Sequence, residues 1–262
     1  MRPVTPVRPV VGYVGGKKLL AATLIERIEL IPHGVYAEPF VGMGGVFLRR
    51  RFAPKCEAIN DISGDVATFF RVLQNHYQAF MDMLRWQVAS RAEFERLMAL
   101  PGEHLTDLQR AARFLYLQAS SFGGKVAGRS FGIHTSAPAR FDPARLQPLL
   151  EGVHERLGGV FIERLDWTEF LARWDRPETL FVVDPPYWGS EHYYGAALFE
   201  KEAFGRLAAA LKALQGRFIL TLNDHPEVRR LFGWASIEAV GLNYRVSGGV
   251  TAARELIIAS VE

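Results

Sequence analysis

The segment TLFVVDPPYWGS, residues 179–190, holds the residues of this sequence best suited to chemistry. A run of apolar, β-favouring residues leads directly into Asp184, Pro185, Pro186 and Tyr187. The two prolines fix two φ angles, so the Pro185 carbonyl is held as an acceptor beside the Asp184 carboxylate. This pair of acceptors suits an exocyclic amino group with its two N–H donors, and Tyr187 offers a flat face for a base. The segment predicts a site for a planar ring bearing an amino group; the ordinary alternative is a stiff loop in which Asp184 caps a helix.

A glycine-rich turn and a later acid indicate a second ligand. EPFVGMGG, residues 38–45, contains Gly42 and Gly44, which accept positive φ and let a ligand approach the backbone. Its spacing is neither GxGxxG nor that of a phosphate-binding P-loop. Asp61 follows about 20 residues later, an offset at which an acid accepts hydrogen bonds from ribose hydroxyls. The alternatives are ordinary strand-to-helix geometry for the turn and capping of the helix near Ser63 for Asp61.

Strand–loop–helix units position these residues. Apolar runs predict strands at 35–38, 56–60, 160–163, 179–184 and 217–222. Helical patterns occur at 17–30, 43–51, 64–76, 167–174, 201–214 and 226–232. Such a series predicts an α/β fold with a parallel sheet covered by helices, whose ligands bind at the carboxyl ends of the strands. The final runs WASIEAV and RELIIAS leave no room for a long helix between them, so they predict a terminal hairpin with its last strand antiparallel to its neighbours.

Residues 77–157 interrupt the alternation and are expected to form a smaller inserted domain. They are rich in helical pattern, with helices expected at 92–99 and 107–119, and they contain the glycine-laden stretch SSFGGKVAGRSFGIHT. We therefore predict two domains: residues 1–76 and 158–262 form one, and residues 77–157 form the other, which is inserted into it.

Composition excludes several classes of protein. The chain has 262 residues, of which 49% are hydrophobic, and a formal net charge of +3, which permits a polyanionic partner. A single cysteine, Cys56, excludes an internal disulfide and a cysteine-rich zinc site, and the histidines show no metal-ligand spacing. No signal peptide and no run of about 18 apolar residues is present, so we expect a cytoplasmic protein with no membrane contact.

The motifs together resemble those of the adenine-N6 DNA methyltransferases of the D12 (Dam-like) class, particularly the phage and prophage type. The resemblance covers nearly the whole chain and is carried by YVGGKKLL, EPFVGMGGVFL, INDISGDVATFFRVLQ, RAARFLYLQASSFGGKVAGRSFG, ERLDWTEFL, TLFVVDPPY and FILTLNDHPEVRRLF. It implies a Rossmann-like class I methyltransferase sheet with a terminal antiparallel hairpin and a small helical target-recognition insertion. It also implies S-adenosylmethionine as the methyl donor, double-stranded DNA as the partner and no metal. A monomer is compatible with the sequence.

Residue roles follow from the resemblance. It implies that Asp184, Pro185 and Tyr187 hold the target adenine, and that Asp184 also borders the cofactor, whose ribose Asp61 binds. The remaining cofactor residues divide by the part of the cofactor they border. Those at the methionine end are Tyr13, Gly15, Gly16 and Lys17, those at the floor of the pocket are Glu38, Pro39, Phe40 and Gly42, and those at the adenine are Asp166 with Trp167 or Phe40. The ordinary alternatives are a helix N-cap for Asp166 and a solvated surface lysine for Lys17.

Contact with DNA requires basic residues and an accessible base. Lys125, Arg129 and Arg140, in the insertion, are the candidates for phosphate contact, and ordinary surface charge is their alternative. The target adenine must leave the duplex to reach Asp184. Met43 stands where many relatives have a small residue, and FGGKVAGRSFG lacks the asparagine of some GATC-specific relatives. The recognition sequence and any partnership with a restriction enzyme stay open.

Five other functions compete with this interpretation. The DPPY residues could also direct methyl transfer to another amino group, either N4 of cytosine in DNA or that of adenine in RNA. A catalytically silent DNA-binding protein on the same fold is disfavoured by the intact Asp184 and Tyr187, and a nicotinamide oxidoreductase by the glycine spacing. A cytosine-C5 methyltransferase needs a nucleophilic cysteine, usually after a proline, whereas Cys56 follows Lys55 on an expected buried strand.

Overall fold

The computed structural model describes residues 1–13, 15–121, 128–133, 138–189, 199–246 and 249–261. The strands are β1 (Arg2–Pro3), β2 (Val35–Glu38), β3 (Phe52–Ala53), β4 (Cys56–Asn60), β5 (Phe161–Glu163), β6 (Thr179–Val183), β7 (Arg217–Asn223), β8 (Ser236–Val246) and β9 (Gly249–Ala259). The helices are α1 (Ala21–Leu30), α2 (Gly64–Asn75), α3 (Tyr77–Leu84), α4 (Arg91–Ala99), α5 (Asp107–Ser120), α6 (Pro143–Arg156), α7 (Trp167–Trp174), α8 (Lys201–Lys212) and α9 (Pro226–Leu231). Two 3-10 turns, η1 (Phe47–Arg49) and η2 (Gly102–His104), complete the described elements.

A central sheet organises the molecule, in the order β5-β4-β2-β6-β7-β9-β8. The pairs from β5 through to β7 are parallel, and β9 lies antiparallel between β7 and β8. The predicted Rossmann-like sheet with a terminal antiparallel hairpin is therefore confirmed. Because the parallel strands point the same way, the segments after β2, β4 and β6 meet at one edge of the sheet.

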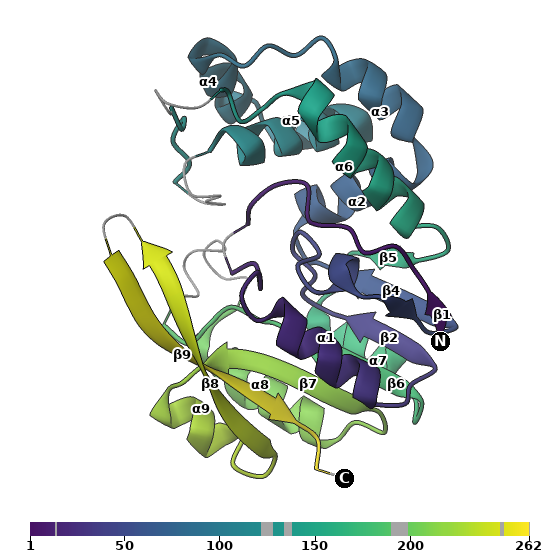
Figure 1. Cartoon of the computed structure of the whole chain (residues 1–262), viewed down its shortest axis with the longest axis vertical. Coiled ribbons are helices and arrows are strands. Elements are labelled where there is room, and N and C mark those ends of the chain that lie inside the picture. Colours follow the sequence, from purple (N-terminus) through teal and green to yellow (C-terminus); the bar gives the residue numbers. More distant parts are fainter. Residues whose placement is uncertain (14, 122–127, 134–137, 190–198, 247–248, 262) are drawn as a thin grey trace.

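Helices cover both faces of the sheet (Figure 1). Leu180 and Val182 of β6 belong to the core shared with α1 and α2, whereas Phe181 and Val183 belong to the core shared with α7, α8 and α9. A strand buried on both faces has no polar face, which explains why TLFVV is a continuous apolar run.

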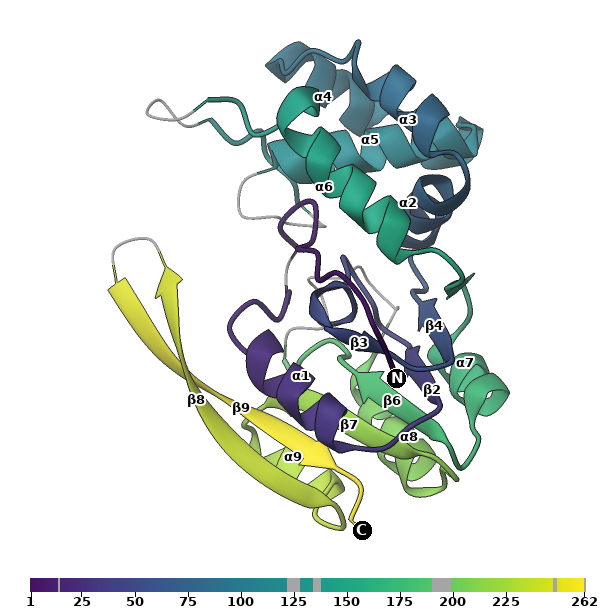
Figure 2. The ribbon, with the colours of Figure 1, turned by 45° about the vertical axis from the view of Figure 1, so that its right-hand side comes forward.

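Helices α3 to α6 gather with α2 at one end of the molecule in both views (Figures 1 and 2). They share one hydrophobic core with α2 and with the face of the sheet that α1 covers. The ring of Phe69 on α2 lies 6.2 Å from that of Phe80 on α3 and 5.7 Å from that of Phe114 on α5. Helix α2 therefore packs against both the sheet and helices α3 to α6.

A buried ionic cluster joins α6 to the sheet. Glu57 on β4 accepts hydrogen bonds from Arg156 on α6, at 2.7 and 2.8 Å, and it also pairs with Arg50. All three side chains are buried. The pKa of Glu57 stays below its usual range although burial raises it, because Arg156 and Arg50 hold the charged form.

The structure corrects the expected helix at 43–51. Gly42 and Gly44 have φ of 50° and 73°, which a right-handed helix does not accept, so the chain makes a turn followed by the short η1. A Cβ on Gly44 would lie 2.8 Å from Leu48 Cγ, so the turn requires a glycine there.

Three other helical segments differ from expectation. The helix expected at 17–30 begins only at Ala21. Helices α3 and α6 were not predicted, since α3 follows α2 without a break in the helical pattern and α6 carries Pro148 in its interior. Asp142, whose side chain accepts from the N–H groups of Ala144 and Arg145, is the cap that marks the start of α6.

Candidate active site

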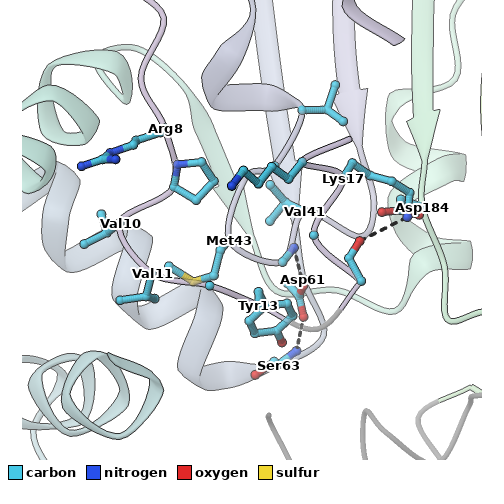
Figure 3. Close-up of a pocket in the computed structure, with 18 of the residues that line it drawn as sticks. Arg8, Val10, Val11, Tyr13, Lys17, Val41, Met43, Asp61, Ser63 and Asp184 are labelled. Carbon is cyan, nitrogen blue, oxygen red and sulfur yellow. Dashed lines mark hydrogen bonds and ion pairs between the residues drawn. The ribbon is translucent and has the colours of Figure 1, made fainter. Parts of the chain in front are cut away.

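A cavity of about 1000 Å³ opens at the edge where β2, β4 and β6 end. The N-terminal segment at 8–18, the glycine turn, the residues after β4 and the beginning of α6 enclose it, as the close-up in Figure 3 shows in part. Predicted site residues from distant parts of the chain therefore meet in one cavity. The predicted residues that line it are Tyr13, Gly15, Gly16, Lys17, Glu38, Phe40, Gly42, Asp61, Arg140 and Asp184.

Asp61 is held by two backbone donors on opposite sides. Its Oδ2 accepts from Gly42 N–H at 3.0 Å and its Oδ1 from Ser63 N–H at 2.9 Å (Figure 3). Burial raises the pKa of Asp61 to about 6, and these two hydrogen bonds oppose the rise. Because Ser63 is the N-cap residue of α2, Asp61 fixes the turn before the helix rather than capping the helix itself. Each of its carboxylate oxygens keeps a second lone pair for a hydroxyl.

Asp184 is paired with a buried lysine. Lys17 Nζ lies 2.6 Å from Asp184 Oδ1 and donates to the carbonyl of Gly15 at 3.2 Å. Lys17 is only 6% exposed, which excludes the solvated surface lysine. Thr221 Oγ1 donates to the same Oδ1 at 2.8 Å, and no described residue donates to Oδ2. The carboxylate is thus anchored through one oxygen, and the other keeps its acceptor capacity.

The charge state of Asp184 depends on this lysine. Burial raises the pKa of Asp184, while the charge and hydrogen bond of Lys17 and the hydroxyl of Thr221 act in the opposite direction. An ionised carboxylate only accepts hydrogen bonds, at both oxygens, whereas a protonated one donates from one of them. Lys17 therefore favours the form of Asp184 that receives an amino group.

The predicted site residues Pro39, Pro185 and Tyr187 are not among those that line the cavity. Pro185 is buried, and Pro186 lines the cavity. The ring of Tyr187 lies beneath Lys17 Nζ, 4.4 Å from the ring centroid, and its hydroxyl donates to Glu255 Oε2 at 2.5 Å. Contacts to Lys17 and Glu255 therefore hold the Tyr187 ring next to Asp184.

The floor of the cavity contains a buried acid. Glu38 Oε2 accepts from the Tyr36 hydroxyl at 2.6 Å. Burial raises the pKa of Glu38 to about 8, although the Tyr36 hydrogen bond and the charge of Arg50 lower it. Glu38 is thus mostly protonated at neutral pH. A cation bound beside it would lower its pKa, so Glu38 would lose its proton and become negatively charged.

Asn60 was not singled out from the sequence, and it joins three predicted site segments. Its side chain is buried and donates to the carbonyls of Pro39 and Leu165, at 3.0 and 3.1 Å, while Leu165 N–H donates to its Oδ1 at 2.8 Å. An asparagine at the end of a predicted strand, directly before Asp61, was the available signal. It fixes the loop after β2 to the loop after β5.

Asp166 and Trp167 do not line the cavity. Asp166 is exposed and caps α7, accepting from Thr168 N–H at 2.9 Å. Trp167 is buried, with its ring 6.5 Å from that of Phe40, which does line the cavity. Trp167 therefore supports the wall from behind, and the cap that the sequence allowed for Asp166 is present.

The candidate DNA-contacting residues differ in position. Arg140 lines the cavity and donates to the Ser121 carbonyl at 3.2 Å. Arg129 is half-buried, donates to Gln118 Oε1 at 3.0 Å, and has a pKa lowered by burial. Lys125 lies outside the described residues. Further basic residues that line the cavity are Arg8, Lys18, Arg49, Arg145 and Arg164.

In the part of the chain that the structure describes, no group of three or more histidine, cysteine, aspartate or glutamate side chains is arranged to hold a metal ion. None of the described helices is long and apolar enough to cross a membrane.

Comparison with known proteins places the chain in a family. A sequence model of the D12 class N6 adenine-specific DNA methyltransferases matches residues 13–245. The DNA adenine methylases of the Classical Ogawa and El Tor Inaba strains of Vibrio cholerae serotype O1 are each 26% identical over 253 residues, which cover 90% of this chain and 88% of theirs.

Similar solved structures include the precorrin 8W decarboxylase of Methanobacterium thermoautotrophicum, with a TM-score of 0.42, 12% identity and full coverage of both chains. The ribosomal protein L11 methylase of Lactobacillus delbrueckii has a TM-score of 0.37 and 13% identity, with 93% of this chain and 77% of that chain covered. Because the family match spans most of the sequence, the chain belongs to the D12 class N6 adenine-specific DNA methyltransferases, whose reaction is methylation of adenine in DNA.

Proposed function

We propose that this protein transfers the methyl group of S-adenosylmethionine to N6 of an adenine rotated out of double-stranded DNA, and that Asp184, Pro185 and Tyr187 receive that adenine. The observation that carries the proposal is the anchoring of Asp184 at the rim of the cavity. Lys17 and Thr221 occupy Oδ1, so Oδ2 and the Pro185 carbonyl are the acceptors offered to an amino group.

The residues of the cavity fit S-adenosylmethionine. Asp61 supplies a carboxylate, fixed by two backbone donors, for ribose hydroxyls. Glu38 supplies an acid that gains charge beside the ammonium group, and Phe40 supplies an aromatic wall for the adenine ring. Tyr13, Gly15 and the other residues before α1 close the methionine end. When bound, the cofactor supplies an electrophilic methyl group on a sulfonium.

Asp184 then acts on the nucleophile. The lone pair of the adenine amino nitrogen is delocalised into the ring, so the nitrogen is a weak nucleophile. Acceptors at Asp184 Oδ2 and the Pro185 carbonyl favour a more tetrahedral nitrogen and stabilise the positive charge that develops on it. The proton is released afterwards to Asp184 or to solvent, and no covalent intermediate on the enzyme is required.

Base flipping follows from the position of Asp184 at the end of a buried strand. An adenine inside a duplex cannot reach this carboxylate, so it must be unpaired at a cost of a few kcal/mol, which stacking on Tyr187 partly offsets. We further propose that residues 77–157 recognise the DNA target, with 1–76 and 158–262 as the catalytic domain. Arg140 supports this proposal, because it brings a positive charge from the insertion to the cavity. Lys125 and Arg129 stay candidates for phosphate contact, and a relation to the phage and prophage type is proposed from the sequence motifs alone.

The experiment is incubation of the protein with methyl-labelled S-adenosylmethionine and either DNA or RNA, followed by nucleoside analysis. We expect label in N6-methyladenine from DNA. The variant Asp184→Ala should lose methyl transfer while binding the cofactor nearly as well as the unmodified protein. Label in N4-methylcytosine, label in RNA alone, or full turnover by Asp184→Ala would each contradict the proposal.

A further inference from the structure

The two strands behind the DPPY segment present polar side chains to it. Thr221 and Asn223 alternate with the buried Leu222, so they point to the opposite face of β7. Asn223 is paired with Glu255 in the antiparallel register between β7 and β9. Directly opposed residues point to the same face, so Glu255 joins the other two.

The side chain of Asn223 binds the backbone of Trp188 as a neighbouring strand would. The Trp188 N–H donates to Asn223 Oδ1 at 2.9 Å, and Asn223 Nδ2 donates to the Trp188 carbonyl at 3.1 Å. One side-chain amide thus satisfies both backbone groups of a residue that lies beyond the end of β6. The indole of Trp188 packs against Phe204 and His225, at ring distances of 4.9 and 5.3 Å. The backbone that leaves Tyr187 is therefore fixed.

Glu255 fixes the far end of the Tyr187 ring. Its Oε2 accepts the Tyr187 hydroxyl at 2.5 Å, and Glu255 is only 3% exposed. Because the pair is buried, water does not replace Glu255 as the partner of the hydroxyl. Tyr187 is thus held at three places: by Pro186 before it, by Trp188 after it and by Glu255 at its hydroxyl.

We propose that Asn223 and Glu255 are positioning residues for the reaction, which set the plane of the Tyr187 ring on which the target base stacks. This inference rests on the proposed function. A tyrosine side chain rotates about two bonds, and a base that must first order the ring binds more weakly and less accurately. Prior fixation of the ring leaves the amino group of the base at a defined distance from Asp184 Oδ2, and small errors of placement reduce rates strongly.

The test uses two matched pairs of variants. Glu255→Gln keeps the shape of the side chain and removes its charge, and Glu238→Gln, on the exposed surface of β8, is its control. Asn223→Ala removes both bonds to Trp188, and the exposed Asn75→Ala is its control. Asn223→Asp, which keeps the acceptor and loses the donor, is used where Asn223→Ala does not fold. Each variant is assayed for kcat and for cofactor Kd. Methylation-aware sequencing of DNA treated with the unmodified protein first gives the target sequence, and the fluorescence of 2-aminopurine placed at the target adenine is then measured for each variant.

We expect kcat to fall about 10-fold in Glu255→Gln and about 10- to 100-fold in the Asn223 variant, with cofactor Kd within about twofold of the unmodified protein. The 2-aminopurine signal of the flipped base should change in the same variants and not in the controls. Because Glu255 acts through the hydroxyl, adding Glu255→Gln to Tyr187→Phe should cause no further loss.

Three results would overturn the inference: unchanged kcat in both variants of an active enzyme, a loss confined to cofactor binding, or additive losses in the double variant. An unmodified protein that methylates no DNA would refute the proposed function instead, so the two failures are distinguishable.

Discussion

The pair between Lys17 and Asp184 supports a quantitative prediction about catalysis. Replacing Lys17 with methionine keeps the length of the side chain and removes its charge. Asp184 then keeps the Thr221 hydroxyl but loses the cation 2.6 Å from Oδ1. Since burial already raises the pKa of Asp184, loss of the lysine raises that pKa further and favours the protonated acid.

The magnitude follows from the burial of the pair. The two side chains are 5% and 19% exposed, so water does not replace the missing cation. A hydrogen bond to a charged group contributes about 1.5–3 kcal/mol. At about 1.4 kcal/mol for each factor of ten, kcat at neutral pH should fall about 10- to 100-fold.

The sign of the pH dependence gives a sharper test. Asp184 accepts the amino group in its ionised form, so activity rises as pH increases through its pKa. In Lys17→Met this rise should move to higher pH, and alkaline buffer should restore part of kcat. The assay is kcat against pH with saturating cofactor, together with cofactor Kd, since Lys17 also borders the cavity. Lys55→Met, at an exposed position before β4, is the control. An unmoved profile, or one moved toward acid, would refute this account of Lys17.

Three further predictions concern other buried acids. The pKa of Asp61 is about 6, so cofactor affinity should fall as pH drops through 6, and Asp61→Asn should bind weakly at all pH values; calorimetry from pH 5 to 8 that shows constant affinity would contradict this. The pKa of Glu38 is about 8, so cofactor binding at pH 7 should release protons, detected as a dependence of the calorimetric enthalpy on the buffer, and Glu38→Gln should abolish that release. Glu57→Gln leaves two buried guanidinium groups without their anion and should lower the free energy of unfolding in urea by about 3–5 kcal/mol. The exposed Glu169→Gln should cost less than about 1 kcal/mol, and equal losses in the two variants would refute the role of the buried cluster.

The parallel part of the fold was predictable because its strands are short apolar runs that alternate with amphipathic helices. The predicted bounds of the strands at 35–38 and 56–60 agree with β2 and β4. The helix predicted at 43–51 is absent because Gly42 and Gly44 adopt positive φ. The pattern of residue types does not show whether a glycine adopts positive φ. Helix α6 was not predicted because Pro148 lies in its interior, and a proline there argues against a helix. Tertiary packing stabilises the helix in spite of it.

The sequence by itself determined the reacting group: an acid, two prolines and a tyrosine are adjacent in the chain, and their chemistry follows from covalent order. It also determined that Asp61 follows a strand end, which places it at the ligand edge of a parallel sheet. Only the tertiary structure decided what sets the charge and orientation of Asp184 and Tyr187. Lys17, Thr221 and Glu255 are distant from Asp184 and Tyr187 in the chain. Strand order and register bring Thr221 on β7 and Glu255 on β9 to them, whereas Lys17 arrives from the segment before α1. Side chains that act on a neighbouring strand have no local signal, because the pairing of strands, rather than the spacing of residues, determines which of them meet.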